Sequence, residues 1–303
     1  MGHEAAIVFS TGYQTNLGTI SALVSRDDVV LIDKLDHASI VDGCTMAEGE
    51  MLRFRHNDMA DLETELKALA ERPGGRLVAV DGVFSMEGDI APIPGLLEVC
   101  RKYGARLFVD EAHSLGVIGP SGGGAMDHYG MKGKADLVMG TFSKSFACIG
   151  GFLAGDEPII HYLKHHARPL LFSASMPPGA VATVAAALQI IKDEPERRAQ
   201  VLENGRYLRD GLRALGFETG PTETPIVPVI IGPLEKTMFF WRMVLDHGIF
   251  TNAVVPPAVP PNACRLRTSC IATHTRAQLD RVLDVFGKVR QRLERFGDDQ
   301  SAS

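Results

Sequence analysis

The segment Leu107-Phe-Val-Asp-Glu-Ala-His-Ser114 decides how the rest of this sequence is interpreted. Three apolar residues run directly into Asp110, a pattern typical of a buried strand that ends in a carboxylate. In open sheets of parallel strands, ligands bind outside the carboxyl ends of the strands. Asp110 is therefore expected to meet a ligand, with His113 beside it. The alternative is an Asp that caps the next helix, with a buried His next to it.

Short apolar runs recur on both sides of this segment and alternate with helical patterns. Such alternation is typical of a mostly parallel sheet covered by helices on both faces, an α/β fold. The predicted strands are Val29–Ile32, Leu77–Val80, Leu107–Val109, Leu137–Met139 and Phe152–Ala154. The predicted helices between them are Asn16–Leu23, Met59–Ala70 and Pro94–Tyr103.

The pattern changes at Pro177-Pro178, where a long apolar helix is predicted to begin. We interpret residues 1–176 as a large α/β domain, 177–194 as a connecting helix and 195–303 as a small C-terminal α+β domain. The elements predicted in this last part are Ala199–Leu215, Glu235–His247 and Arg276–Phe296 as helices, and Ile226–Ile231, Ile249–Asn252 and Leu266–Ser269 as strands.

Composition excludes some classes of function. The 303 residues carry 31 Lys and Arg against 37 Asp and Glu, a net charge of −6. Without a basic run interleaved with aromatics, a nucleic-acid partner is not expected. The longest apolar stretches are too short to span a bilayer. Five scattered cysteines without a Cys-x-x-Cys pair predict free thiols in the cytoplasm.

A second strand end supports the ligand interpretation. Asp136-Leu-Val-Met-Gly-Thr-Phe-Ser-Lys144 delivers a Lys among small hydroxyl residues. An amine in a pocket of low dielectric loses its charge readily and can form a Schiff base with an aldehyde. Pyridoxal phosphate (PLP) needs such an amine, together with a carboxylate that keeps its ring nitrogen protonated. A lone Lys after a strand is usually solvated, but Lys144 next to Asp110 favours a PLP site, with Thr141 and Ser143 near the phosphate.

Three further segments fit the same edge of the sheet. Gly12 and Tyr13 precede a predicted helix, whose free N–H groups favour a phosphate, although an ordinary N-cap has the same pattern. His37 follows the Val29–Ile32 strand and can stack on a flat ring, or can be a satisfied structural His. Ser85 can donate to a ring hydroxyl or can be a turn residue.

Outside that edge, two features have weaker signals. Arg267 can bind a substrate carboxylate through two hydrogen bonds, or can lie on a solvated face. The cluster His161-Tyr-Leu-Lys-His-His166 has helical spacing, but neither Cys nor carboxylate stands in metal-ligand register with it. We interpret it as a surface, and no metal site is expected.

Five motifs in the same order resemble the α-oxoamine synthases, which are PLP enzymes of fold type I, the aspartate-aminotransferase fold. The resemblance runs from about Gly2 to about Arg290. It implies that the N-terminal segment of the family, roughly a hundred residues, has no counterpart here. The motifs are Thr11-Gly-Tyr-Gln-Thr-Asn16, Asp36-His-Ala-Ser39, Asp81-Gly-Val-Phe-Ser-Met-Glu-Gly-Asp89, Asp110-Glu-Ala-His-Ser114 and Gly140-Thr-Phe-Ser-Lys-Ser145.

The resemblance implies a role for each matching residue. Lys144 would form the Schiff base and take the α-proton of the substrate, and Asp110 would pair with the ring nitrogen. His113 would contact the ring oxygen, and His37 would stack on the ring and contact the substrate. The remaining matches would be Gly12, Tyr13, Thr141 and Ser143 around the phosphate, Ser173 reaching the phosphate of a partner subunit in a homodimer, and Arg267 on the substrate carboxylate.

The implied reaction is decarboxylative condensation of an amino acid with an acyl-CoA to give an amino ketone, CoA and CO2. Within the family, Arg53-Phe-Arg-His-Asn57 and the Lys144 motif look most like the serine palmitoyltransferase branch, which favours L-serine, palmitoyl-CoA and a place near membranes. Val255 departs from it, because an Arg stands there in that branch. The alternatives are 8-amino-7-oxononanoate synthase or 2-amino-3-ketobutyrate CoA ligase activity, and an inactive, truncated relative.

Overall fold

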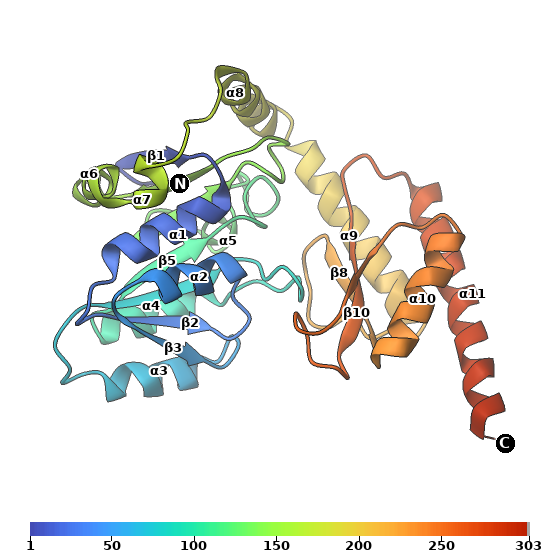
Figure 1. Cartoon of the computed structure of the whole chain (residues 1–303). Helices are drawn as coiled ribbons and strands as arrows, with labels where there is room; N and C mark the ends of the chain where they lie inside the picture. The colour runs from blue at the N-terminus through green and yellow to red at the C-terminus, as the bar shows by residue number, and fades with distance from the viewer. Residues whose placement is uncertain (302–303) are drawn as a thin grey trace. The chain divides into compact units, whose positions relative to one another are not determined.

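The computed structural model describes the backbone of residues 1–301 and the side chains of residues 1–293 (Figure 1). The chain forms two compact units. Unit 1 comprises Met1–Phe84 and Ile90–Pro195, and unit 2 comprises Ser85–Asp89 and Glu196–Ser303. The long apolar helix therefore belongs to unit 1, and a five-residue segment from the middle of unit 1's sequence belongs to unit 2.

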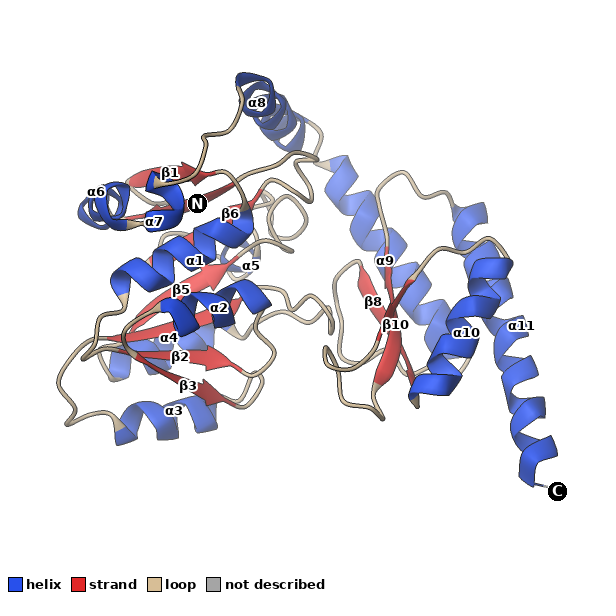
Figure 2. Ribbon diagram, in the orientation of Figure 1, coloured by secondary structure: helices blue, strands red, loops and turns tan. Residues whose placement is uncertain are grey.

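A seven-stranded sheet forms the centre of unit 1, in the order β1-β7-β6-β5-β4-β2-β3 (Figure 2). Five neighbouring strands, from β6 to β3, run parallel, and β7 lies antiparallel between β6 and β1. The predicted mostly parallel sheet is confirmed. The strands are β1 (Ala5–Phe9), β2 (Val29–Asp33), β3 (Glu50–Phe54), β4 (Arg76–Asp81), β5 (Arg106–Asp110), β6 (Leu137–Thr141) and β7 (Gly151–Gly155).

Helices cover the sheet because side chains on both of its faces are buried. Helix α1 contacts α2, α6 and α7, whereas α3 contacts α4, so these two sets of helices form separate layers. The helix starts follow capping rules: Thr11 Oγ1 accepts from the Gln14 N–H at 3.1 Å, and Asp58 from the Asp61 N–H at 3.0 Å. The helices are α1 (Gly12–Leu23), α2 (Ala38–Met46), α3 (Met59–Ala68), α4 (Ile93–Lys102), α5 (Ala125–His128), α6 (Glu157–His166), α7 (Arg168–Leu171) and α8 (Pro178–Asp193).

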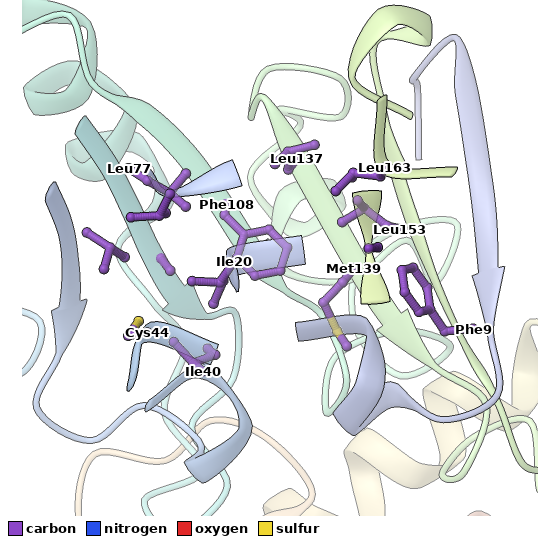
Figure 3. Close-up of a cluster of buried hydrophobic side chains, with 14 of the residues drawn as sticks. Phe9, Ile20, Ile40, Cys44, Leu77, Phe108, Leu137, Met139, Leu153 and Leu163 are labelled. Carbon is purple, nitrogen blue, oxygen red and sulfur yellow. The ribbon is translucent and has the colours of Figure 1, made fainter. Parts of the chain in front are cut away.

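The main core of unit 1 lies between the sheet and the layer that contains α1 (Figure 3). Alternate residues along each strand point into it, such as Leu137 and Met139 of β6, and they meet Ile20 and Ile40 of α1 and α2. Because a shift of one residue would turn these side chains to the other face, the core fixes the register of the parallel strands. Their carboxyl ends therefore lie at one edge.

Unit 2 is an antiparallel sheet in the order β8-β10-β9, packed with three helices. Its core contains Phe217, Phe240 and Phe286, whose rings meet edge to face with centroids 5.4 to 5.9 Å apart. The elements are α9 (Glu196–Ala214), β8 (Ile226–Gly232), α10 (Leu234–Asp246), β9 (Asn252–Val254), β10 (Cys264–Ser269) and α11 (Arg276–Ser301).

The strand predicted over Ile249–Asn252 is wrong by three residues, because β9 begins only at Asn252. The Ile249 N–H closes α10 by donating to the Val244 carbonyl at 3.0 Å, and Gly248 has the positive φ (+81°) of a helix end. Phe250 is 80% exposed in the loop that follows. Ile249 therefore closes α10, and Ile249 and Phe250 do not begin a strand.

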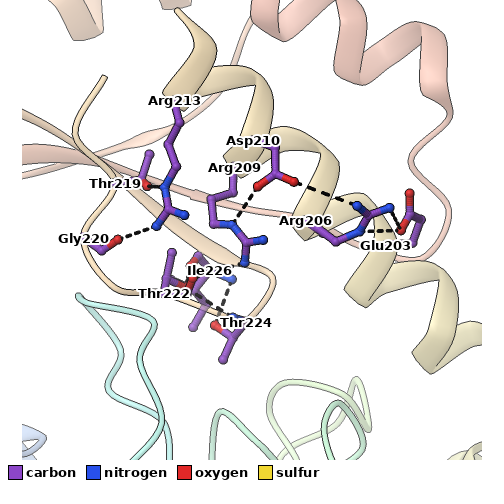
Figure 4. Close-up of polar contacts among 10 residues, drawn as sticks. All are labelled: Glu203, Arg206, Arg209, Asp210, Arg213, Thr219, Gly220, Thr222, Thr224 and Ile226. Atoms are coloured by element: carbon purple, nitrogen blue, oxygen red, sulfur yellow. Dashed lines mark hydrogen bonds and ion pairs between the residues drawn. The ribbon is translucent and has the colours of Figure 1, made fainter. Parts of the chain in front are cut away.

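Hydrogen bonds explain why residues 85–89 belong to unit 2. The hydroxyls of Thr222 and Thr224 both donate to the Gly88 carbonyl, at 2.9 and 2.8 Å. The loop that carries them is held to α9 by Arg213, which donates to Thr219 Oγ1 at 2.8 Å, and by Arg209, which donates to the Thr222 carbonyl at 3.2 Å (Figure 4).

Within residues 1–301, no helix combines the length and the apolar character that crossing a membrane requires.

Candidate active site

A cavity of about 330 Å³ opens in unit 1 where the parallel strands end. Strands β4, β5 and β6 end there in Asp81, Asp110 and Thr141, and α1 begins at the same place. This is where ligands bind in open α/β sheets. The predicted residues that line the cavity are Gly12, Tyr13, His37, Asp110, His113, Thr141, Ser143 and Lys144.

Asp110 forms part of the cavity wall, with its side chain only 3% exposed. Its Oδ2 accepts from Asn16 Nδ2 at 2.7 Å, and its Oδ1 accepts from the Ala112 N–H at 2.8 Å. Both oxygens are thus fixed by donors from the protein. A carboxylate held in this way can meet a cationic N–H of a bound ring without reorienting.

Asp81 is the in-register neighbour of Asp110 on the adjacent strand β4. Burial raises the pKa of Asp81 well above its usual range, and the negative charges of Asp110 and Asp36 raise it further. One oxygen, Oδ2, is buried without a hydrogen-bond partner. The protonated form of Asp81 is therefore favoured beside the carboxylate of Asp110, which can serve as the counter-ion for a bound cation.

His37 is the N-cap residue of α2. Its Nδ1 accepts from the Ser39 N–H at 3.2 Å and lies 2.7 Å from Ser39 Oγ. The ring is exposed to the cavity, yet exclusion of water by surrounding atoms lowers the pKa of His37, and the charge of Lys144 lowers it further against the pull of Asp110 and Asp42. A neutral, flat imidazole is thus available to a ligand.

Hydroxyl groups and a helix start form the other side of the cavity. Thr141 Oγ1 lies 2.9 Å from Ser143 Oγ and donates to the Gly150 carbonyl at 3.1 Å. A Cβ on Gly12 would come within 2.6 Å of Thr141 Oγ1, so only Gly lets α1 begin this close to β6. Hydroxyls beside free backbone N–H groups at a helix start suit a phosphate.

Lys144 lines the cavity from the loop after β6 and is exposed. Its role as the amine that binds the cofactor stays a prediction. Tyr13 is also exposed, and its hydroxyl donates to Asp42. His113 is half-buried at the cavity wall.

Three predicted residues do not line this cavity. Ser173 Oγ accepts from Gln14 Nε2 at 2.9 Å, on the α1 side of unit 1. Ser85 and Arg267 both belong to unit 2, where Arg267 Nε donates to the Ser85 carbonyl at 2.5 Å. Their roles stay predictions.

Sequence reasoning missed Asn16, Ser39 and Asp81 as parts of the site. Each lies in a motif that was noted, but only long-range contacts identify it: Asn16 reaches Asp110 across 94 residues of sequence. The one local signal was the position of Asp81, which ends its strand as Asp110 does. Within the described residues, no cluster of three or more His, Cys, Asp or Glu could hold a metal ion.

The geometry therefore suits a flat ligand with a phosphate at one end, a cationic ring nitrogen at the other and an amine-reactive group near Lys144. Comparisons with known proteins support this interpretation of the site. A profile of the family described as "Aminotransferase class I and II" matches residues 1–286.

Similar sequences include a serine palmitoyltransferase from Sphingobacterium spiritivorum, 46% identical over 294 residues, which are 97% of this chain and 73% of the relative. An 8-amino-7-oxononanoate synthase from Thermoanaerobacter pseudethanolicus is 41% identical over 290 residues, which are 96% of this chain and 73% of the relative.

Among solved structures, a serine palmitoyltransferase from S. paucimobilis with a bound PLP–myriocin aldimine superimposes with a TM-score of 0.93 at 41% identity, covering 97% of this chain and 74% of that one. An 8-amino-7-oxononanoate synthase from Francisella tularensis, 24% identical with a TM-score of 0.84, shares the fold over 96% of this chain and 83% of its own.

Proposed function

Because this chain belongs to the α-oxoamine synthases within the class I and II aminotransferases, we propose that it condenses L-serine with a long-chain acyl-CoA, palmitoyl-CoA being favoured. The products would be an amino ketone, CoA and CO2. Relatives named serine palmitoyltransferase, at 45 to 46% identity in three cases, support the choice of substrates. One observation carries the proposal: Asp110, at the end of β5, and Lys144, in the loop after the adjacent strand β6, line one cavity.

The family's cofactor is PLP, and the residues at this cavity fit it. Asp110 is buried with both oxygens fixed, hydroxyls and the start of α1 form an anion cradle, and the space at Gly12 would be lost to any Cβ. When bound, PLP supplies an aldehyde for an amine and a ring that withdraws electrons from the α-carbon of an amino acid.

Each side chain has a separate task in this proposal. Asp110 holds the ring nitrogen protonated, because its fixed carboxylate favours a cation at that point. Thr141, Ser143 and the α1 N–H groups bind the phosphate, and His113 donates to the ring oxygen. His37 would cover the ring and keep water from the reacting face.

Lys144 is proposed to move the proton. Its amine would accept the α-proton of the bound amino acid. Transfer of the acyl group to the α-carbon would break the thioester and release CoA, whose thiolate takes up a proton to become a thiol. Loss of CO2 would break the bond from the α-carbon to the carboxylate, and a proton would take the place of the carboxylate. Arg267 is proposed to receive the substrate carboxylate through two hydrogen bonds.

Release of free thiol from acyl-CoA tests the proposal, with purified protein, PLP and a panel of serine, glycine and alanine against several acyl lengths. Serine with palmitoyl-CoA is expected to give the highest rate. Lys144→Ala should abolish both the visible absorption of bound PLP and thiol release, whereas Lys134→Ala, at an exposed position on the same unit, should change neither. Transamination without thiol release would refute the condensation.

A second candidate is 8-amino-7-oxononanoate synthase activity, which relatives at 41 to 43% identity support. The same panel of amino acids and acyl-CoAs distinguishes the two activities, because 8-amino-7-oxononanoate synthase activity requires a preference for an amino acid other than serine and an acyl group other than palmitoyl.

We further propose that the protein is a homodimer with a shared active site. Helix α8 supports this, because it is rich in apolar residues yet none of them is buried. Val181 and Leu188, seven residues apart on one stripe, are 52% and 41% exposed, and Phe172 nearby in sequence is 81% exposed. An apolar surface of this kind is typical of a protein interface. A cytoplasmic location is proposed from the five cysteines, all free thiols.

A further inference from the structure

One continuous relay of hydrogen bonds joins Asp110 to His37 along the cavity wall. Asn16 Nδ2 donates to Asp110 Oδ2 at 2.7 Å and to Ser39 Oγ at 2.8 Å. Ser39 Oγ lies 2.7 Å from His37 Nδ1. Asn16 and Ser39 are each only 1% exposed, so water does not compete for these hydrogen bonds.

The direction of each hydrogen bond follows from which groups are able to donate. An amide nitrogen and a backbone N–H only donate. Asn16 Nδ2 therefore donates to Ser39 Oγ, and the Ser39 N–H, 3.2 Å from His37 Nδ1, donates to that nitrogen. An unprotonated His37 Nδ1 satisfies both neighbours, with the Ser39 hydroxyl at 2.7 Å making the shorter hydrogen bond to it and the N–H at 3.2 Å the longer one. A neutral His37 thus carries its proton on Nε2.

The helix start reinforces this assignment. Helix α2 begins immediately after His37, and the imidazole is its N-cap acceptor. A proton on Nδ1 would face the Ser39 N–H and remove the cap, and the positive end of the helix disfavours an imidazolium. Burial lowers the pKa of His37 and so favours the neutral ring; of the charged groups around it, Lys144 also opposes protonation, while Asp110 and Asp42 favour it.

We propose that Ser39 and Asn16 are positioning residues that lock His37 as the Nε2–H tautomer, so that it offers the cavity a hydrogen-bond donor and not a base. Asn16 couples that choice to Asp110, because the same amide holds both residues. The matching ligand group is a carboxylate or carbonyl oxygen, and this last assignment alone rests on the proposed function. Proton removal is then left to Lys144.

Nuclear magnetic resonance of the full chain with bound PLP tests the tautomer directly. With ¹⁵N-labelled histidine, long-range ¹H–¹⁵N correlations distinguish a protonated from an unprotonated ring nitrogen, and His37→Asn identifies the signals of His37. At neutral pH we expect a protonated Nε2 and an unprotonated Nδ1. A proton on Nδ1, or on both nitrogens, would overturn the proposal.

Variants test the relay. Ser39→Ala removes the hydroxyl donor, so the His37 signals should shift towards a mixture of tautomers, and kcat/KM should fall about tenfold, the typical effect of one hydrogen bond. Ser39→Thr keeps the hydroxyl and should restore both. Ser21→Ala, on α1 with its hydroxyl on the Leu17 carbonyl, is the control and should change neither.

If Ser39→Ala leaves the His37 signals as in the wild type, Ser39 does not set the tautomer and the inference is wrong, whatever happens to the rate. If the tautomer is as expected but no thiol is released from acyl-CoA, the proposed function fails while the positioning role stands.

Discussion

Replacement of Gly12 by Ala should separate α1 from the end of β6. The added Cβ would lie 2.6 Å from Thr141 Oγ1 and 2.7 Å from Thr141 Cβ. Thr141 is only 4% exposed and is held by Gly150 and Ser143, so it has no free space to move into. Overpacking of this kind typically costs about 1–3 kcal/mol.

Gly179→Ala is the matched control. Gly179 lies in the first turn of α8, and a Cβ there would meet nothing within 4 Å. Both replacements are made in a Val181→Lys background, in which the proposed α8 interface is broken, so that the control measures the gain in helix propensity alone, up to about 1 kcal/mol. Relative to the control, Gly12→Ala should lower Tm by roughly 2–12 °C, taking about 2–4 °C per kcal/mol.

Thermal unfolding followed by circular dichroism measures this difference, and a PLP titration of the same samples should show weaker binding by Gly12→Ala. If Gly12→Ala melts at or above the control and binds PLP as tightly as the wild type, the close packing of α1 on Thr141 is not a constraint, and the argument for the anion cradle is lost.

Three more changes test other parts of the structure. Burial raises the pKa of Asp81, so its contribution to stability is present at acid pH and lost as pH rises through the folded-state pKa. In urea unfolding, the wild type should lose stability relative to Asp81→Asn from about pH 4 upward. A difference in stability that does not depend on pH would contradict this. Val181→Lys on α8 should convert the dimer to a monomer in size-exclusion chromatography, whereas Gln189→Lys on the same helix should not; a monomeric wild type would remove the proposed interface. Arg267→Lys should raise the KM for the amino acid about tenfold with a small change in kcat, since Lys cannot form two parallel hydrogen bonds; Arg101→Lys on α4 is its control, and equal KM values would exclude the carboxylate role.

The strands that the sequence did not predict are β1 and β3, and both lie at the edges of the seven-stranded sheet. A central strand such as β2 is buried at all five positions and is a continuous apolar run. Edge strands keep one side in water, so β3 carries Glu50 and Arg53 and shows no such run. The rule that found the central strands could not find β3, whereas β1, Ala-Ala-Ile-Val-Phe, is an apolar run that the same rule could have found.

The residues of the candidate site also form two groups, those that local sequence patterns predict and those that they do not. Asp110, Lys144 and Thr141 were predictable because each follows an apolar strand, and strand ends meet at one edge. Asn16 and Ser39 lie near the starts of helices, where an amide or a hydroxyl is common for local reasons. Their importance arises from partners that are distant in sequence, and local patterns do not contain that information.

The pentapeptide Ser85–Asp89 has a consequence for how this protein can be divided. The chain leaves unit 1 after Phe84, contributes five residues to unit 2 and returns at Ile90, so the two units are connected three times. Ending the chain at Pro195 would strip those five residues of Thr222, Thr224 and Arg267, their hydrogen-bonding partners. A chimera between relatives should therefore exchange this pentapeptide together with everything after Pro195. A single crossover at Pro195 would combine the pentapeptide of one parent with hydrogen-bonding partners from the other parent.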